Sequence, residues 1–341
     1  MRDILILTDY RGLYRQGINR NQGINLSKVE MILKNNGFDI KILDYDTLIN
    51  KIGIHNIKNY IIFYTSSQNE VYRSYVDDII YQLSENNLVL PRYEILKCHE
   101  NKCIEEVVRK KYKLDNMKSY VFSTYLDVIK YKDKFSYPII IKCSTGSGSI
   151  SVYKANDENE LIRRIKKISR GKGYFEFYLK FIYKKIKRIA CEEYLLDEKY
   201  YRKYIIQEFI PGLDEDWKVL VFSDKFYVLN RKVREGDFRA SGSGKFSYLT
   251  PPESILNKAK EVYEKLDVPF LSLDLCIDKK QGVHLIEFQG VHFGPYTLMN
   301  SPYYFEYKNE KWNRIDENSD LSEEYGWALV NYIKRKKECQ N

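Results

Sequence analysis

The chain has 341 residues, of which 44% are hydrophobic and 30% are charged. This length suits about two to three structural units of ~100–200 residues each, and the composition excludes a disordered or collagen-like chain. No apolar run in the sequence approaches the ~20 residues of a membrane span, and the N-terminus does not resemble a signal peptide, so we expect a cytoplasmic protein.

The six cysteines show no CxxC spacing and do not cluster with the four histidines. This pattern favours free thiols over a zinc site. The formal net charge of +9 is unevenly distributed along the chain. Between Leu161 and Ala190 eleven basic residues accompany a single acid, Glu176, which leaves the rest of the chain nearly neutral. The charge therefore belongs to one segment and is not a general nucleic-acid signal.

The first hundred residues alternate between strand-like and helix-like patterns. Apolar runs predict strands, and a period of three to four predicts helices between them. The expected strands are 4–7, 40–43, 60–64 and 88–90, and the expected helices run through Val29 to Leu33 and from about Glu70 to Leu83. Because a helix separates the first two strands, the βαβ pattern implies parallel pairing, and the whole stretch predicts a small open α/β sheet.

The middle of the chain begins with a helical pattern over 101–114, followed within 137–153 by two strands around a Gly/Ser turn. Asp157 is placed to cap a further helix. In the basic segment, the spacing of the apolar residues predicts an amphipathic helix. These residues are Phe175, Tyr178, Ile182, Ile186 and Ile189.

In the last third, short strands joined by short turns favour an antiparallel sheet. The expected strands are 204–209, 218–222, 226–229, 271–277 and 283–288, and 321–338 is expected to close the chain as a helix. The fold class is therefore α/β (α+β). The expected domains are an N-terminal α/β domain over 1–97, a central lid lobe over 98–206 that carries the basic segment, and a C-terminal lobe over 207–341.

A lysine at the end of a predicted strand precedes a turn of small residues. Lys142 ends the strand, and the turn contains Gly146, Ser147, Gly148 and Ser149. An ammonium group beside bare backbone N–H groups suits phosphate oxygens. The turn is neither a Walker A loop nor a dinucleotide-binding turn, and a glycine-rich hairpin with a surface lysine gives the same pattern.

A second segment ends a strand with Gln207, Glu208, Phe209 and Ile210 before Pro211-Gly212. Backbone groups at such a strand edge could pair with a purine. Asp214 and Asp216 follow shortly, and either carboxylate could accept hydrogen bonds from ribose hydroxyls.

The third segment places oxygen-bearing side chains on two predicted neighbouring strands. Asp274 lies on one strand, and Glu287 and Gln289 lie on the other. The step of two residues directs Glu287 and Gln289 to the same face. Two carboxylates and an amide are hard donors of the kind Mg²⁺ prefers when it also binds phosphates.

These three segments, in this order, resemble the ATP-grasp superfamily, which holds ATP with Mg²⁺ between two lobes. In that superfamily a first phosphate-binding lysine lies early in the nucleotide-binding part, and Asn101-Lys102 is similar to that stretch. The second lysine lies in a P-hydrophobic-K stretch before GS-G, which Pro138 to Gly148 resembles, with Cys143 in place of the usual proline.

The resemblance also assigns the later motifs. It implies that Gln207 to Ile210 form the adenine hinge and that Asp216 binds the ribose. Asp216-Trp217-Lys218-Val219 is similar to a D-x-R-V motif of the glutathione-synthase-like and glutamate-ligase-like branches, with Lys218 in place of arginine. Arg231 and Arg239 resemble the arginines that face the transferred phosphoryl group.

The same resemblance implies that Asp274, Glu287 and Gln289 are the metal ligands, with glutamine in place of the family's asparagine. The implied activity is an ADP-forming ligase in which ATP, positioned by Lys102, Lys142 and Arg239, converts a carboxylate to an acyl-phosphate that an amine then attacks. His292 follows the metal strand and either contacts the acceptor or packs in its loop.

Two other functions stay open: an ATP-grasp kinase acting on a small molecule or sugar, and a non-catalytic basic protein that binds nucleic acid. The second is disfavoured because the basic segment contains no recognised nucleic-acid module. The acceptor is expected to be acidic, such as a nucleotide-linked sugar, a uronic-acid glycan of the cell surface or an acidic peptide. The basic segment could instead attach the protein to the inner face of a membrane or form a solvated helix face.

Overall fold

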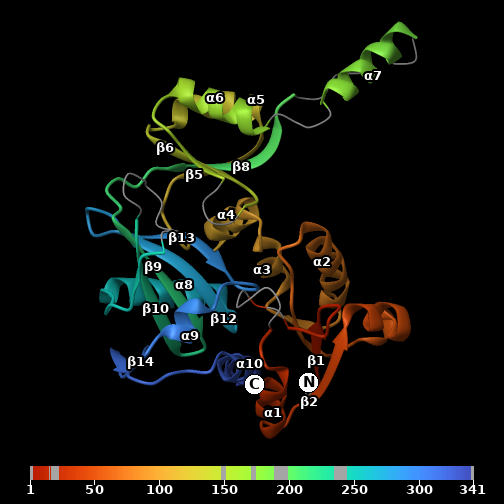
Figure 1. The fold of residues 1–341 in the computed structure, drawn as a ribbon, viewed down its shortest axis with the longest axis vertical. Coiled ribbons are helices and arrows are strands. Elements are labelled where there is room, and N and C mark those ends of the chain that lie inside the picture. The colour runs from red at the N-terminus through yellow and green to blue at the C-terminus, as the bar shows by residue number, and fades with distance from the viewer. Residues whose placement is uncertain are drawn as a thin grey trace. The chain divides into compact units, whose positions relative to one another are not determined.

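The computed structural model describes residues 3–14, 16, 23–146, 151–169, 174–187, 199–233 and 244–338. The described residues form two compact units (Figure 1). Unit 1 contains Met1–Glu100, Val108–Asp115 and Pro211–Asn341, and unit 2 contains Asn101–Val107 and Asn116–Ile210. Unit 2 is therefore inserted in the sequence of unit 1. The division into three domains stays a prediction.

The N-terminal part of unit 1 contains a parallel sheet in the order β2-β1-β3-β4. Its strands are β1 (Asp3–Thr8), β2 (Asp39–Asp44), β3 (Ile61–Tyr64) and β4 (Leu88–Leu90). The helices are α1 (Leu26–Asn35), α2 (Glu70–Ser84) and α3 (Tyr93–Cys98), with a π-helical turn at Thr47–Ile52 and a 3-10 turn at Ile54–Asn56. The predicted open parallel sheet is confirmed.

The rest of unit 1 is built on an antiparallel sheet in the order β13-β12-β9-β10-β14-β15, with β11 paired to β10. Its strands are β9 (Glu215–Phe222), β10 (Lys225–Lys232), β11 (Phe246–Ser247), β12 (Phe270–Ile277), β13 (Val283–Gln289), β14 (Tyr304–Lys308) and β15 (Lys311–Ile315). The helices are α8 (Glu253–Leu266), α9 (Tyr296–Asn300) and α10 (Leu321–Glu338). Helix α4 (Lys102–Lys111) begins in unit 2 and ends in unit 1.

Unit 2 contains an antiparallel sheet in the order β5-β8-β6-β7. The strands are β5 (Ser119–Thr124), β6 (Ile139–Cys143), β7 (Val152–Ala155) and β8 (Tyr201–Glu208). The helices are α5 (Tyr125–Tyr131), α6 (Glu158–Ser169) and α7 (Tyr174–Ile186), with a 3-10 turn at Lys132–Lys134. The Asp157 carboxylate accepts a 2.8 Å hydrogen bond from the backbone N–H of Glu160, so the predicted cap of α6 is confirmed.

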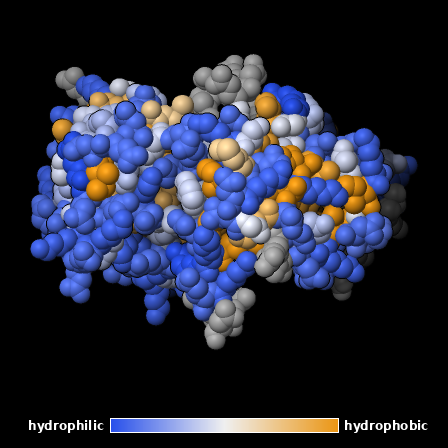
Figure 2. All heavy atoms as spheres, turned by 90° about the horizontal axis from the view of Figure 1, so that it is seen from below, coloured by the Kyte–Doolittle hydropathy of each residue, from blue (hydrophilic) through white to orange (hydrophobic). Residues whose placement is uncertain are grey.

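The core of unit 1 joins segments from both ends of its sequence. Phe63 of β3, Phe270 of β12 and Tyr325 of α10 lie in one buried cluster, with 4.7 Å between the ring centroids of Phe270 and Tyr325. In unit 2 a separate cluster packs Leu161 and Ile165 of α6 on the sheet. The face drawn in Figure 2 is mostly hydrophilic, with hydrophobic residues gathered in smaller areas.

Most longer elements match the sequence prediction. The strands and α-helices that were not predicted are β5, β11, β14, β15, α3, α5, α8 and α9. Helix α8 carried a readable signal, because its buried residues recur at helical spacing. The predicted position Ile189 of the basic amphipathic helix lies outside the described residues. Within the described part of the chain, no helix has both the length and the apolar composition to cross a membrane.

Candidate functional site

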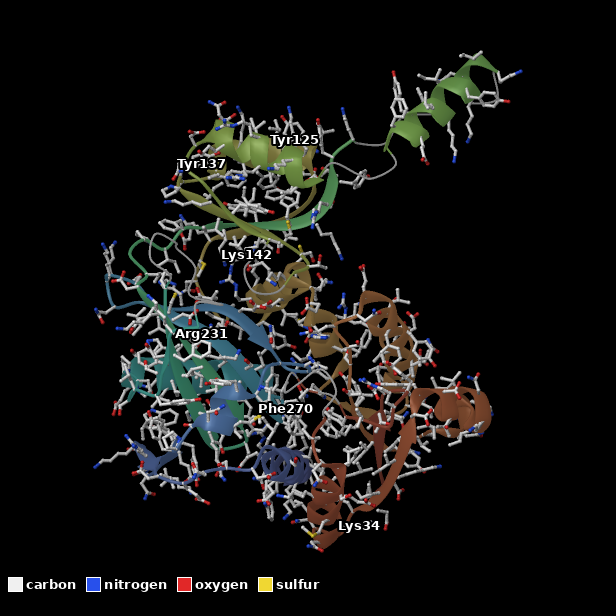
Figure 3. All side chains as sticks on the ribbon, viewed as in Figure 1. Lys34, Tyr125, Tyr137, Lys142, Arg231 and Phe270 are labelled. Carbon is white, nitrogen blue, oxygen red and sulfur yellow. The ribbon has the colours of Figure 1, made fainter. Side chains whose placement is uncertain are left out.

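Lys142 lies on β6, the central strand of the unit 2 sheet together with β8 (Figure 3). Its cross-strand partners are Val152 on β7 and Ile205 on β8. The neighbouring residues Ile141 and Cys143 are almost fully buried, whereas Lys142 is only partly buried. Because side chains alternate along a strand, Lys142 lies on the face opposite to the one on which Ile141 packs in the core with α6.

The structure brings Lys102 to the turn that follows Lys142. The Lys102 ammonium donates a 2.8 Å hydrogen bond to the Gly146 carbonyl, and the Lys102 backbone N–H donates a 2.9 Å hydrogen bond to the Ser144 carbonyl. The Ser144 hydroxyl donates to the Asn101 side-chain oxygen at 2.8 Å. The two segments predicted to hold phosphate lysines are therefore adjacent, although they are far apart in the sequence.

Gly146 is required by its backbone geometry. Its φ is +124°, which L side chains rarely adopt, and a Cβ at this position would lie 2.5 Å from the Ser151 hydroxyl. The turn can therefore approach a ligand with bare backbone. The next turn residues, Ser147, Gly148 and Ser149, lie outside the described residues.

The predicted adenine hinge is the end of β8 and the two residues beyond it. Gln207 is 5% exposed and pairs with Ser119 and Ile140. The Glu208 backbone N–H donates to the Lys118 carbonyl at 3.0 Å, and the Glu208 carboxylate accepts from the Lys118 backbone N–H at 3.0 Å. Since sheet pairing uses the Glu208 N–H, a purine would have to contact other backbone groups of Gln207 to Ile210.

In unit 1, one face of the antiparallel sheet changes from apolar to charged along its strands. Leu220, Phe222, Tyr227 and Phe270 on β9, β10 and β12 belong to the core cluster. Charged residues follow farther along these strands, an even number of residues from the apolar ones, so their side chains lie on the same face of the sheet. They are paired across neighbouring strands. The paired residues are Asp216 with Arg231, Lys218 with Asp274, and Asp274 with Glu287.

Arg231, labelled in Figure 3, lies between two carboxylates. Its Nε and Nη2 donate to Asp216 at 2.6 Å and 2.9 Å, and Nη2 lies 2.8 Å from Asp274 Oδ2. The Lys218 ammonium donates to Asp274 Oδ1 at 3.3 Å and to the Ser272 hydroxyl at 2.9 Å. Three carboxylates, including Glu287, therefore share this face with two cations.

The two aspartates respond differently to this environment. Burial opposes the ionisation of Asp274, but the charges of Arg231 and Lys218 outweigh it and lower its pKa to about 2. Burial raises the pKa of Asp216 to about 6, against the opposing effect of Arg231. The difference follows from their neighbours, because Asp274 has two cations while Asp216 shares a single guanidinium with another carboxylate.

The predicted metal ligands lie on adjacent strands in register. Asp274 is directly opposite Glu287, and Ser272 is opposite Gln289. The Gln289 amide donates a 3.0 Å hydrogen bond to Glu287 Oε1. Two carboxylates and an amide oxygen are a suitable donor set for Mg²⁺. Among the described residues no cluster of three or more His, Cys, Asp and Glu side chains could hold a metal, so Gln289 or a ligand would have to supply the remaining donors.

A buried polar cluster surrounds the loop after β13. Gln16 donates to the Val291 carbonyl at 3.0 Å and accepts from the Phe293 backbone N–H at 3.2 Å. His292, 8% exposed, has its ring centroid 5.7 Å from that of His99. Burial, assisted by His292, lowers the pKa of His99 to about 3, so this imidazole is neutral.

Sequence reasoning missed His99 and Ser272. Ser272 could have been found, because it lies two residues before Asp274 on a predicted strand and so shares its face. His99 lies two residues before Asn101-Lys102, but no sequence signal places it beside His292. The predicted phosphoryl-contacting residue Arg239 lies outside the described residues.

No protein-family model matches the sequence. The chain is 25% identical, over 199 residues, to the alpha-aminoadipate–LysW ligase LysX of Saccharolobus solfataricus. The match covers 58% of this chain and 63% of LysX, so it spans less than two thirds of that relative's length.

Two solved structures match along almost the whole chain. The D-alanine–D-alanine ligase from Bacillus anthracis complexed with ATP gives a TM-score of 0.55 at 13% identity, with 99% of each chain covered. The ATP-grasp ligase PsnB complexed with minimal precursor, Mg and ADP gives 0.54 at 11% identity, with 96% of each covered. This chain has the ATP-grasp fold. The resemblance to the ATP-grasp superfamily seen in the motifs is therefore confirmed at the level of the fold, whereas the roles of single residues stay predictions.

Proposed function

We propose that this ATP-grasp chain is an ADP-forming ligase that joins a carboxylate to an amine. The observation that carries the proposal is the contact between the Lys102 ammonium and the Gly146 carbonyl, which joins two distant phosphate-binding motifs of the superfamily at one turn. The relatives support the reaction class, since each of those named above is called a ligase.

In this proposal the residues divide into a phosphate set and a metal set. Lys102, Lys142, Arg239 and the backbone of 146–149 bind the ATP phosphates, and Gln207 to Ile210 contact the adenine. Asp274, Glu287 and Gln289 would hold Mg²⁺, once Asp274 releases Arg231 or Lys218, and the ion would neutralise phosphate charge. Asp216 would bind the ribose only if its bidentate pair with Arg231 opens, so we assign it first to the orientation of Arg231.

The reaction has two steps. A carboxylate oxygen of the acceptor attacks the γ-phosphorus of ATP, the bond to ADP breaks, and an acyl-phosphate forms. The amine nitrogen then attacks the acyl carbon, inorganic phosphate leaves and the amine loses a proton. Positive charge from the lysines and Arg239 stabilises the charge that develops on the transferred group. His292, which lies beside the neutral His99, would contact the acceptor.

The test measures ADP and phosphate release with paired panels of acids and amines. The acids include uronic acids, nucleotide-linked sugars and acidic peptides, because a cell-surface glycan or peptide is the substrate class that we propose. Release that requires both an acid and an amine supports the ligase. A stable phosphorylated product formed from one substrate alone would instead identify a kinase. Failure to bind ATP, with tight binding of RNA, would refute both.

A further inference from the structure

Helix α7 (Tyr174–Ile186) carries large hydrophobic side chains that are exposed to solvent. Phe175 is 71% exposed, Ile186 is 74% exposed, and Leu179 and Tyr183 between them are also exposed. Large apolar side chains are usually buried inside a protein. A group of them exposed on one face of a helix marks an interaction surface. The neighbouring helix α6 differs, because its Leu161 and Ile165 are buried in the unit 2 core.

The side chains of α7 separate into two stripes along the helix. Phe175, Leu179, Ile182 and Ile186 recur at steps of four, three and four residues and so share one face. Glu176, Lys180, Lys184 and Lys187 recur at steps of four, four and three residues and so share another face. At 100° per residue these four residues fall within an arc of roughly 80°, which is a narrow polar stripe. The fourth lysine of the helix, Lys185, lies outside this stripe, beside the apolar side chains.

We propose that α7 is an interfacial helix that binds the surface of an anionic lipid bilayer and lies parallel to it. The apolar stripe would enter the boundary between headgroups and acyl chains, as amphipathic helices with Phe and Leu on one face and lysines on the other do. The helix is too short and too charged to cross the bilayer, in agreement with the absence of a spanning helix among the described residues.

Charge favours an anionic bilayer over a second copy of the chain. Residues 174–187 contain four lysines and one acid, a net charge of +3. A second copy of α7 would bring like charges together, which disfavours pairing of two such helices. An anionic bilayer attracts each lysine, and long lysine side chains reach the headgroups while their methylene groups stay near the apolar boundary.

This inference does not depend on the proposed ligase activity. The test is co-sedimentation of the full-length protein with vesicles of phosphatidylcholine alone, or of phosphatidylcholine containing one quarter phosphatidylglycerol. We expect binding to the anionic vesicles only, and weaker binding as salt is added. A Phe175→Trp variant should show a blue shift of the emission of the introduced tryptophan when it binds, because the side chain leaves water.

Two variants separate the stripes. Lys180→Glu/Lys184→Glu/Lys187→Glu should weaken binding by on the order of 100-fold, at about fivefold for each lysine removed. Phe175→Gln/Leu179→Gln/Ile186→Gln should weaken it at least about tenfold while keeping good helix formers in place. The matched controls are Lys41→Glu/Lys51→Glu/Lys311→Glu, at exposed positions of unit 1, and Val71→Gln/Tyr81→Gln, which removes exposed apolar residues from α2.

The proposal is overturned if the wild-type protein ignores anionic vesicles or if the apolar-stripe variant binds them as the wild type does. It is also overturned if sedimentation velocity shows a dimer without lipid that the apolar-stripe variant loses, since the occupant is then a second copy. ATP binding, followed in parallel by calorimetry, should be unchanged in all four variants. A wild-type protein that binds ATP but ignores anionic vesicles would refute this inference alone. A wild-type protein that binds the vesicles but not ATP would refute the proposed function alone.

Discussion

Replacement of Arg231 by glutamine tests whether the charged end of the unit 1 sheet depends on one guanidinium. The side chain of Arg231 is 8% exposed, and it is bidentate to Asp216, whose side chain is 6% exposed. Removing one partner of a buried ion pair leaves an uncompensated charge, which typically lowers the free energy of unfolding by about 3–5 kcal/mol. For a unit of this size that corresponds to a fall in melting temperature of roughly 10 °C at pH 8.

The same reasoning predicts how this loss depends on pH. Burial already raises the pKa of Asp216 to about 6 with Arg231 present, and loss of the guanidinium would raise it further. A carboxyl whose folded pKa lies above its unfolded value lowers the stability of the fold as pH rises from about 4 through the folded pKa. The gap between variant and wild type should therefore shrink as pH falls from 8 to 5.

The assay is thermal unfolding followed by circular dichroism from pH 5 to pH 8. Arg231→Gln/Asp216→Asn should recover part of the loss at pH 8, because the carboxylate that was bidentate to Arg231 is removed and Asp274 keeps its pair with Lys218. Arg314→Gln is the matched control, since Arg314 is 44% exposed and pairs with the exposed Asp316, so its loss should change stability by less than about 1 kcal/mol. The reasoning fails if Arg231→Gln melts like the wild type at pH 8, or if its deficit is the same at pH 5.

Three further predictions concern the lysine, the metal set and a histidine. Lys142→Met should raise the Kd for ATP, measured by calorimetry, by at least about tenfold. The control Lys130→Met, at an exposed lysine, should leave the Kd unchanged. Equal affinities of Lys142→Met and the wild type would contradict the role of Lys142. Glu287→Gln should raise the Mg²⁺ concentration needed for nucleotide binding by about tenfold or more, because it removes one hard anionic donor, and an unchanged Mg²⁺ titration would exclude Glu287 as a ligand. Hydrogen bonds from His284 to Asp115 and Asp278 raise the pKa of His284 to about 9, so this pairing stabilises the fold fully below pH 6.5 and is lost as pH rises through 9. Between pH 6.5 and 9 the free energy of unfolding in urea should fall by about 1–2 kcal/mol, a value already reduced for solvent screening. His284→Gln should abolish this fall. The same dependence of unfolding free energy on pH in both proteins would rule out a contribution from this histidine.

The sequence predicted the positions of most strands because their apolar runs are long and well separated. The pairing of Arg231 with Asp216 could also be deduced from the sequence. A turn of two residues, Ser223 and Asp224, joins β9 to β10, and this length places Arg231 opposite Asp216. The family resemblance implies separate roles for the two residues, whereas the hairpin register pairs them with each other.

The remainder of the network could not be predicted in this way. Asp274 joins Arg231 and Lys218 only because β12, which follows a long intervening segment, pairs with β9 in a particular register. No local turn sets that register, since it depends on packing across the whole sheet. Likewise, the hydrogen bond from Lys102 to Gly146 depends on where α4 begins relative to the unit 2 sheet.

The insertion of unit 2 within unit 1 affects the order in which the protein can fold during synthesis. Tyr325, on the last helix, packs against Phe63 of the N-terminal sheet, with 6.1 Å between ring centroids. The N-terminal sheet therefore leaves the ribosome long before the aromatic ring that completes its core. At typical translation rates of ~5–20 residues per second, synthesis of residues 101–325 takes on the order of 10–40 s. During that interval Ile4, Ile6 and Phe63 lack their final partners, so a nascent chain stalled before α10 should be a good chaperone substrate.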